Sequence, residues 1–457
     1  MGWGEIEFRH DPAFYRASFR ELTNKIERGS FATLGSVSVF SSEAWDQQSL
    51  FGDEFPYLEI SSIDLVTGDI KMLDLVPVEE AASRARMIVH PNDLLVSMTR
   101  PSRGAIARAA DHLPNPFIAS TGFGVIRHVD TGRISADYLL LVLRSQISLR
   151  QMEQRSSGGN YPAITSTELK RIKLPIPSQT EQEALVAKYH NAIGVLKNAR
   201  AEAAALLESI DDFLLSELDI NLLPEIENTL INRKFRVAAA DLSGWRFDPP
   251  VHQSKFSLES ASLDSVPLGR ICHINPRTSF GRLHDTDLAG FVPMDAISDR
   301  LGIVEYVDER RIEECSGYTT FCDNDVLWAK ITPCMENGKS AVARDLTNGV
   351  GFGSTEFHVI RPRSTAVLPE YVHSLLRMGR LRREAKRFFT GSSGHRRVDD
   401  DFLKKLVVPL PPRSLQERLV QEIRAKRDQA IELEKSATAK LESAKREIEA
   451  ILLGEAA

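Results

Sequence analysis

The sequence has few cysteines and lacks the motifs of several common enzyme classes. Its four cysteines (Cys272, Cys315, Cys322 and Cys334) form no C-x-x-C pair and accompany no histidine cluster, so they favour reduced thiols over a zinc site. There is no G-x-x-x-x-G-K-[ST] loop, no G-x-S-x-G and no H-E-x-x-H. These absences exclude an ATP-driven motor of the phosphate-loop type, a nucleophile-elbow hydrolase and a zincin. We therefore expect no catalytic residue and no metal site in this chain.

Long apolar runs are also missing. The longest clean run, residues 138–143, is far shorter than the roughly 20 residues that a membrane-spanning helix needs. The first ten residues have no basic segment followed by an apolar core, so they do not resemble a signal peptide. We expect a soluble intracellular protein that makes no membrane contact.

Charge of one sign is not in large excess. The chain of 457 residues has 57 Lys and Arg against 63 Asp and Glu, a net charge of −6, with 42% hydrophobic and 26% charged residues. Such a mixture is typical of soluble globular proteins, and at about 150 residues per domain the length favours about three domains. The total charge by itself argues against a free-standing DNA-binding protein, which usually has a basic footprint.

The chain contains a tandem duplication. Six short blocks recur in the same order with an offset of 232 to 237 residues: 9–12 and 246–249, 93–99 and 325–332, 120–127 and 354–361, 137–138 and 370–371, 156–159 and 392–394, 169–177 and 403–411. A long period of this kind means that one structural unit is built twice. The two copies share a task, or they are packing modules without one, and the sequence alone leaves both possibilities open.

Each copy predicts the same order of elements. Short apolar runs punctuated by Gly, Pro, Asn and Asp predict short strands at 55–60, 93–96, 124–126, 302–304, 325–328 and 357–360. Helical periodicity follows at 136–154 and 369–389, and a Pro-x-Pro segment then leads into a long helix. The fold class is α+β, with two tandem α/β units and two long helices.

The long helices, expected at 180–217 and 415–453, have the spacing of a coiled-coil seam. Apolar residues alternate at intervals of three and four, as in a heptad repeat. The predicted seam residues are Leu185, Leu196, Leu206, Ile210, Ile423 and Ile451. Arg427 and Glu434 interrupt one register of the second helix. The alternative is an amphipathic helix that packs on its own domain.

Chain order gives an expected arrangement. The predicted segments are a globular unit at 1–177, a helix at 178–220, a linker and second globular unit at 221–412, and a helix at 413–457. If the helices pack as an antiparallel coiled coil, the two globular units acquire pseudo-twofold symmetry. A helix of about 38 residues spans roughly 57 Å, longer than one turn of DNA at about 34–36 Å.

Basic residues are concentrated before the Pro-x-Pro segment of each copy. Residues 376–405 contain ten Lys and Arg against four Asp and Glu, and residues 144–173 contain six against two. Because phosphate neutralisation depends on local positive charge, these stretches predict contacts with DNA in spite of the net charge. A solvated helix face is the alternative for any single residue.

The repeated motifs resemble the specificity subunit of Type I restriction–modification enzymes. The resemblance rests on SSGGNY at 156–161 followed by LPIPSQTEQ at 174–182, and on GSSGHR at 391–396 followed by VPLPPRSLQ at 408–416. It implies a non-catalytic reader of double-stranded DNA. Each globular unit would be a target recognition domain for one half of a bipartite sequence.

The resemblance also implies a location in a prokaryotic cytoplasm and partners that this chain does not encode. The antiparallel helices would set the gap between the half-sites and dock methyltransferase subunits. Those subunits would bring S-adenosylmethionine, and a motor–nuclease subunit would bring ATP and Mg, so no cofactor is expected in this chain. A related system with a fused methyltransferase–nuclease partner, and a scaffold protein without a DNA role, are the alternatives.

Individual DNA contacts follow from side-chain chemistry. Arginine and lysine contact phosphates, and arginine pairs bidentately with guanine edges. We predict DNA contacts from two groups, basic side chains and residues of the glycine-rich loops: Arg100, Arg103, Lys330, Arg396 and Arg397, with Asn160, Tyr161 and His395. Turn formation and core packing are the structural alternatives for these residues.

Overall fold

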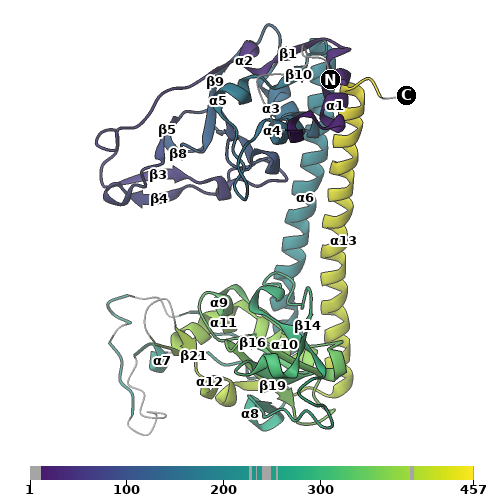
Figure 1. The fold of residues 1–457 in the computed structure, drawn as a ribbon. Helices are drawn as coiled ribbons and strands as arrows, with labels where there is room; N and C mark the ends of the chain where they lie inside the picture. Colours follow the sequence, from purple (N-terminus) through teal and green to yellow (C-terminus); the bar gives the residue numbers. More distant parts are fainter. Residues whose placement is uncertain are drawn as a thin grey trace. The chain divides into compact units, whose positions relative to one another are not determined.

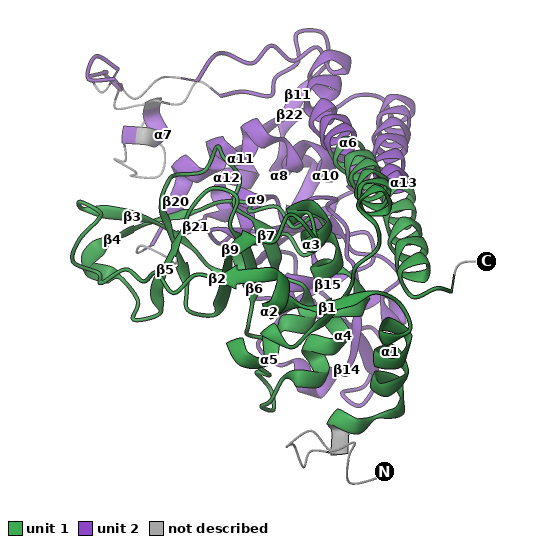
Figure 2. Cartoon of the chain, turned by 90° about the horizontal axis from the view of Figure 1, so that it is seen from above, with its two compact units in different colours: residues 1–200, 434–457 green, residues 201–433 purple. Residues whose placement is uncertain are grey.

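The computed structural model describes residues 12–225, 229–232, 234–238, 249–253, 256–391 and 396–455. It divides into two compact units, which Figure 2 colours separately: unit 1, residues 1–200 and 434–457, and unit 2, residues 201–433. The long helices are α6 (Gln179–Glu217) and α13 (Arg413–Leu452), which Figure 1 labels. Each contributes one part to either unit, as the colours of Figure 2 show. The four consecutive segments expected from the sequence stay a prediction, and the boundary between the units falls within each long helix.

Unit 1 contains two four-stranded sheets and a two-stranded one. The first sheet has the order β2–β9–β6–β7 and is antiparallel throughout, and the second has the order β4–β3–β8–β5 with a parallel β3–β8 pair. The two short strands β1 and β10 pair separately. The bounds are β1 (Phe31–Thr33), β2 (Ser38–Phe40), β3 (Glu54–Leu58), β4 (Asp74–Pro77), β5 (Ala85–Val89), β6 (Leu94–Ser97), β7 (Ile106–Arg108), β8 (Phe117–Ser120), β9 (Phe123–Val129) and β10 (Lys173–Pro175).

The helices of unit 1 lie before and after these sheets in the sequence. They are α1 (Ala17–Glu27), α2 (Leu34–Val37), α3 (Ala136–Arg144), α4 (Gln146–Arg155) and α5 (Ser166–Lys170), followed by the first part of α6. The Ser135 side chain accepts a hydrogen bond from the Tyr138 N–H and so caps α3. The buried hydroxyl of the Tyr138 side chain donates to the carbonyl of Pro175 at 3.0 Å. This bond joins α3 to the strand that precedes α6.

Unit 2 repeats the strand order of unit 1. Its sheets are β12–β19–β16–β17, β14–β13–β18–β15 with a parallel β13–β18 pair, and the pair β11–β22. The bounds are β11 (Ser265–Pro267), β12 (Cys272–Ile274), β13 (Leu288–Val292), β14 (Asp308–Arg311), β15 (Thr319–Cys322), β16 (Val326–Ala329), β17 (Ser340–Val342), β18 (Val350–Gly353), β19 (Phe357–Pro362) and β22 (Val407–Pro409). The duplication that the sequence predicts is therefore also present in the topology.

Unit 2 has helices at the corresponding places and one additional pair of strands. The helices are α7 (Pro249–Gln253), α8 (Leu268–Ile271), α9 (Cys334–Asn337), α10 (Pro369–Arg377), α11 (Gly379–Ala385) and α12 (Asp400–Lys405), and the added strands are β20 (Phe389–Thr390) and β21 (Arg397–Val398). The strand predicted at 302–304 is absent. Gly302 has a φ of +67° and only Val304 makes an isolated bridge, to Ile297, because the chain turns there.

The cores between the sheets correspond residue by residue. In unit 1, Leu58, Leu95 and Phe123 pack together in a buried cluster. In unit 2, the residues at the corresponding strand positions, Val292, Leu327 and Phe357, form the matching cluster. All four residues of β6 and all four of β16 are buried, which explains why both read as continuous apolar runs.

The two long helices pair antiparallel. In unit 2, Arg418 Nη2 lies 2.6 Å from Glu217 Oε2, and Lys426 Nζ donates to Ser209 Oγ at 3.2 Å, so residue numbers rise on one helix as they fall on the other. In unit 1, Lys188 pairs with Glu447 in the same sense. Within the described residues, no helix is long and apolar enough to cross a membrane.

The predicted seam largely coincides with the buried stripes. Leu185 and Leu196 are buried in unit 1, and Ile210 and Ile423 are buried in unit 2. Leu206 is half-buried. Ile451 is 46% exposed, so its prediction as a seam residue is wrong; it lies in the last turn of α13, and the last buried apolar position there is Ile448.

Candidate nucleic-acid interface

Two loops meet at the carboxyl end of β6 in unit 1. The Arg100 N–H donates to the carbonyl of Pro162 at 2.7 Å, and the Ile164 N–H donates to the carbonyl of Met98 at 2.9 Å. Within the second loop, Ser157 and Ala163 exchange two backbone hydrogen bonds. The glycine-rich segment that the sequence singles out is therefore anchored on the segment that follows β6.

Four predicted DNA contacts come together on this loop pair. Arg100 donates from Nη2 and Nε to the carbonyl oxygen of Asn160 at 2.9 and 3.3 Å, and its guanidinium lies 4.2 Å from the centre of the Tyr161 ring. Tyr161 is 71% exposed, and Arg103 is exposed one turn further on. Arg100 has a φ of +47°, an uncommon conformation that these contacts support. A guanidinium and an aromatic ring are thus ordered together at the surface.

The equivalent place in unit 2 has the same backbone but other side chains. Val398 N–H donates to the carbonyl of Lys330, and Thr332 N–H donates to the carbonyl of Arg396, matching the Ile164 and Arg100 bonds of unit 1. Lys330 is half-buried and Arg396 is exposed. The predicted contact His395 lies outside the described residues.

Arg397 differs from its neighbour Arg396, because it is engaged in a bidentate ion pair. Its Nε and Nη2 lie 2.8 and 2.6 Å from the two carboxylate oxygens of Glu356. The hydrogen bond to Glu356 raises the pKa of Arg397. A phosphate that bound Arg397 would therefore compete with a carboxylate that already engages its Nε and Nη2.

Several side chains of the two basic stretches pair with carboxylates from elsewhere in the chain. Arg383 lies 2.8 Å from Glu225, Lys386 lies 2.6 Å from Glu336, and the side chain of Lys173 pairs with Glu27. The local excess of Lys and Arg in the sequence therefore overstates the positive charge that these stretches offer to DNA. The count of charged residues within each stretch did not predict these ion pairs, because the paired carboxylates are distant along the chain.

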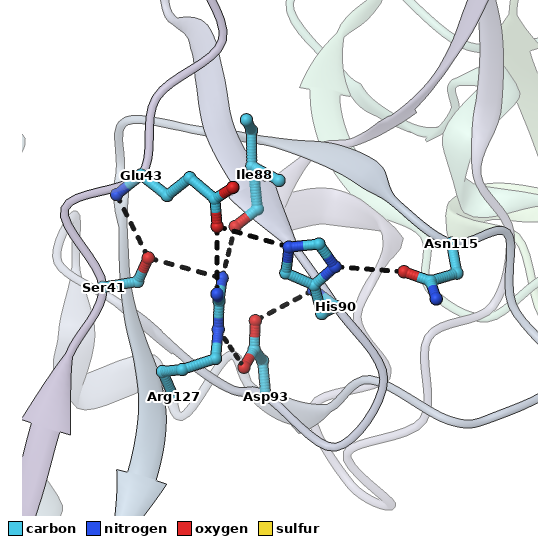
Figure 3. A network of polar contacts seen from close by, with 7 residues as sticks. All are labelled: Ser41, Glu43, Ile88, His90, Asp93, Asn115 and Arg127. Carbon is cyan, nitrogen blue, oxygen red and sulfur yellow. Dashed lines mark hydrogen bonds and ion pairs between the residues drawn. The ribbon is translucent and has the colours of Figure 1, made fainter. Parts of the chain in front are cut away.

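A polar network lies at the opposite end of β6 from the loop pair (Figure 3). The carboxylate of Asp93, which is 1% exposed, accepts from Arg127 Nε at 2.7 Å, and Arg127 Nη1 pairs with Glu43 at 3.0 Å. His90 lies between Glu43 and Asn115. The hydrogen bond from Arg127 is the main reason why the pKa of Glu43 is lowered. In unit 2, Arg361 and Asp325 form the corresponding pair at 2.7 and 2.6 Å, so the pair belongs to the fold of both units.

In each unit a buried glutamine and a buried arginine hold separate segments together, a role that the sequence motifs did not predict. Gln182 accepts from the Ser135 N–H and donates to two carbonyls, and Gln416 makes the same three bonds with its own neighbours. Arg144 donates to the carbonyls of residues 65, 66 and 106, and Arg377 donates to those of residues 299, 300 and 338. The repeated glutamine was visible in the sequence, whereas the arginine pair lay within stretches interpreted as DNA contacts.

The comparisons with known proteins agree with the predicted resemblance. Residues 77–199 match the family model of the Type I restriction modification DNA specificity domain. The chain is 36% identical over 156 residues to the Type I restriction enzyme EcoEI specificity subunit of Escherichia coli, a match that covers 34% of this chain and 26% of that protein. It is 25% identical over 164 residues to the StySPI specificity subunit of Salmonella potsdam, covering 35% and 34%. The resemblance to Type I specificity subunits is confirmed, although the chain spans about a quarter of the first curated relatives' length.

Two solved structures cover more of the chain at lower sequence identity. A chain from a study of complex assembly in the type I R-M system covers 93% of this chain and 96% of its own length, with 21% identity and a TM-score of 0.49. The HsdS subunit from Thermoanaerobacter tengcongensis covers 93% and 95%, with 22% identity and a TM-score of 0.36.

Proposed function

We propose that this chain is the DNA sequence-recognition subunit of a Type I restriction–modification complex, and that each unit reads one half of a bipartite target. One observation carries this proposal. The two units share sheet order and buried hydrogen bonds, yet the exposed side chains on their equivalent loop pairs differ. A duplicated frame with divergent loops suits a protein that reads two different half-sites.

In unit 1 the reading surface would include the ordered Arg100–Tyr161 pair. An arginine held in place loses less rotamer freedom on binding and can pair bidentately with a guanine edge. In unit 2, exposed Arg396 and half-buried Lys330 occupy the equivalent loops. Arg103 is placed to contact the phosphate backbone, which positions a protein on DNA without reading sequence.

The remaining functions belong to partners. The net charge of −6 and the partly neutralised basic stretches suit a subunit that supplies selectivity while other subunits supply much of the binding energy for DNA. Methyltransferase subunits dock on the long helices, whose length sets the gap between half-sites. Those subunits bring S-adenosylmethionine, the motor–nuclease subunit brings ATP and Mg, and this chain acts without cofactor or catalytic residue of its own.

Methylome sequencing tests this assignment. The chain is expressed with its neighbouring methyltransferase, and residues 1–170 are replaced by the first recognition unit of another specificity subunit. We expect one half of the methylated motif to change, while the other half and the wild-type control stay as they were. A methylated motif that stays the same in both halves would contradict the proposal and favour a scaffold role. Separate or fused methyltransferase and nuclease reading frames beside the gene distinguish the two restriction systems.

A further inference from the structure

Unit 2 contains a cationic cavity where its long helices meet the helices of its globular part. The cavity is about 410 Å³ and opens to solvent. Helices α6, α10, α11 and α13 supply most of its lining, and the turn at 299–300 supplies the rest. The lining includes four arginines and three carboxylates: Arg300, Arg377, Arg382 and Arg427, with Glu208, Asp211 and Asp299. Its volume lies within the range of about 300–1,000 Å³ that is usual for small-molecule sites.

Arg427 differs from Arg377 and Arg382, whose guanidinium groups donate to backbone carbonyls. Among the residues that the structure describes, none forms a hydrogen bond or an ion pair with its guanidinium. Burial lowers the pKa of Arg427, and no carboxylate offsets this effect. A guanidinium presents five N–H donors in a rigid fork, so leaving it partly desolvated and unpaired is costly.

The other groups of the cavity do not compensate Arg427. The terminal nitrogens of Arg377 donate to the carbonyls of Gly338, Asp299 and Arg300. Burial, with the nearby charges of Arg427 and Arg382, lowers the pKa of Arg377 to about 9. Several cations therefore raise the electrostatic potential of one cavity.

Asp211, the most buried carboxylate of the cavity, is directed elsewhere. Its Oδ2 accepts from the backbone N–H of Gly379 at 2.7 Å. Burial raises its pKa, which shows that the neighbouring arginines do not fully offset the desolvation of its charge. Asp211 thus fastens α11 to α6 and leaves the Arg427 guanidinium without a carboxylate partner.

Unit 1 provides an internal comparison, because the duplicated position there is closed. The matching cavity, lined by Leu141, Arg144 and Tyr189 among others, is only about 10 Å³. Tyr189 fills the space and its hydroxyl accepts from Arg144 Nε at 3.2 Å. At the corresponding positions of the sequence, unit 2 has Ser374 for Leu141, Ile423 for Tyr189 and Arg427 for the buried Ile193. Where unit 1 has a nearly closed site filled by Tyr189, unit 2 has an open cationic cavity.

We propose that this cavity of unit 2 binds a small oxyanion of the phosphate class, as free phosphate or as a small phosphate ester, with Arg427 as its main ligand. A phosphate oxygen would accept from the unpaired guanidinium, and charge-assisted hydrogen bonds of this kind are the stronger ones. The cavity is too polar to attract an apolar ligand, and its excess of arginines opposes a metal cation. Phosphate binding in this cavity would be separate from the recognition of a DNA sequence, and it does not depend on whether the chain binds DNA.

The test is a calorimetric titration of the full chain with inorganic phosphate at constant ionic strength, with sodium chloride as the compensating salt. We expect one saturable site. The variant Arg427→Met should bind phosphate at least tenfold more weakly, because it loses the charge-assisted hydrogen bonds. Arg424→Met is the matched control: Arg424 lies one turn earlier on α13, its side chain is 82% exposed, and it does not line the cavity. Circular dichroism checks that both variants are folded.

A second variant keeps the inference testable if Arg427→Met fails to fold. Ser374→Leu introduces the leucine that unit 1 has at this place and should weaken binding by filling the cavity while every arginine remains. A parallel titration with adenosine monophosphate distinguishes the sources: tighter binding than inorganic phosphate identifies a phosphate ester, and weaker or equal binding identifies the free anion. The absence of saturable phosphate binding, or equal binding by wild type, Arg427→Met and Ser374→Leu, would overturn the proposal.

Discussion

Replacing Gln416 by alanine should loosen unit 2 and leave unit 1 intact. Gln416 is fully buried near the start of α13. Its amide oxygen accepts from the Leu368 N–H at 2.9 Å, and its amide nitrogen donates to the carbonyls of Ala366 and Pro411 at 3.0 and 2.9 Å. The side chain therefore fastens the turn before α10 to the segment that leads into α13.

The expected cost follows from these three bonds. Each hydrogen bond contributes about 1 kcal/mol, and a buried partner left unsatisfied costs about as much or more, so Gln416→Ala should destabilise the unit by about 3 kcal/mol. This corresponds to a shift of roughly a hundredfold in the equilibrium between closed and locally opened states. Gln182→Ala removes the same three bonds from unit 1 and is the matched variant.

Hydrogen exchange read by mass spectrometry separates the two units. Peptides that cover residues 366–376 should exchange roughly a hundredfold faster in Gln416→Ala, and those that cover residues 133–143 should do so in Gln182→Ala. Exchange that changes less than threefold in the expected peptides would refute the reasoning. So would equal acceleration of both peptides in either variant, because the bonds described act within one unit.

Three further predictions concern the loops and the titrating carboxylates. Arg100→Ala should weaken binding of DNA carrying the cognate half-site by about 1–3 kcal/mol in the assembled methyltransferase, measured by fluorescence anisotropy, and an unchanged affinity would remove Arg100 from the reading surface. Because the pKa of Asp211 is raised above its ordinary 3.8 by burial, its contribution to stability is fully present below that pH and is lost as pH rises through the raised value. Asp211→Asn should flatten this part of the profile of unfolding free energy against pH, and an identical slope in the variant would contradict the assignment. For Glu43 the pKa is lowered, chiefly by Arg127, so its contribution is present above its ordinary 4.5 and is lost as pH falls through the lowered value. Glu43→Gln should lose that acid-side dependence in thermal melts, and a variant that retains it would show that the Arg127 network is not its source.

The architecture was accessible from the sequence because it rests on local and repeated patterns. The recurring blocks predicted two copies of one unit, and the strand orders of units 1 and 2 agree. Heptad spacing predicted the buried stripes of the long helices, since helical periodicity fixes which face is apolar. At the last turn of α13, Ile451 keeps the spacing but lies exposed, because periodicity does not show where the packing partner ends.

The candidate site was predicted less completely, because side-chain pairing depends on residues far apart in the chain. The sequence identified Arg100, Asn160 and Tyr161 as candidates in two separate segments, but not that they contact one another. It also counted Arg144 and Arg377 among residues that could contact DNA, whereas both are held by backbone carbonyls inside their units.

The sequence by itself determined the duplication, the order of the elements and the family resemblance, because each of these depends on the order and spacing of residues along the chain and not on tertiary contacts. Only the tertiary structure decided which charges are available. Carboxylates such as Glu225 and Glu356 reach the basic stretches from distant positions and neutralise arginines there. The same folding places Arg427 in a cavity where no carboxylate of the described residues pairs with it, although in the sequence it is merely an interruption of a heptad.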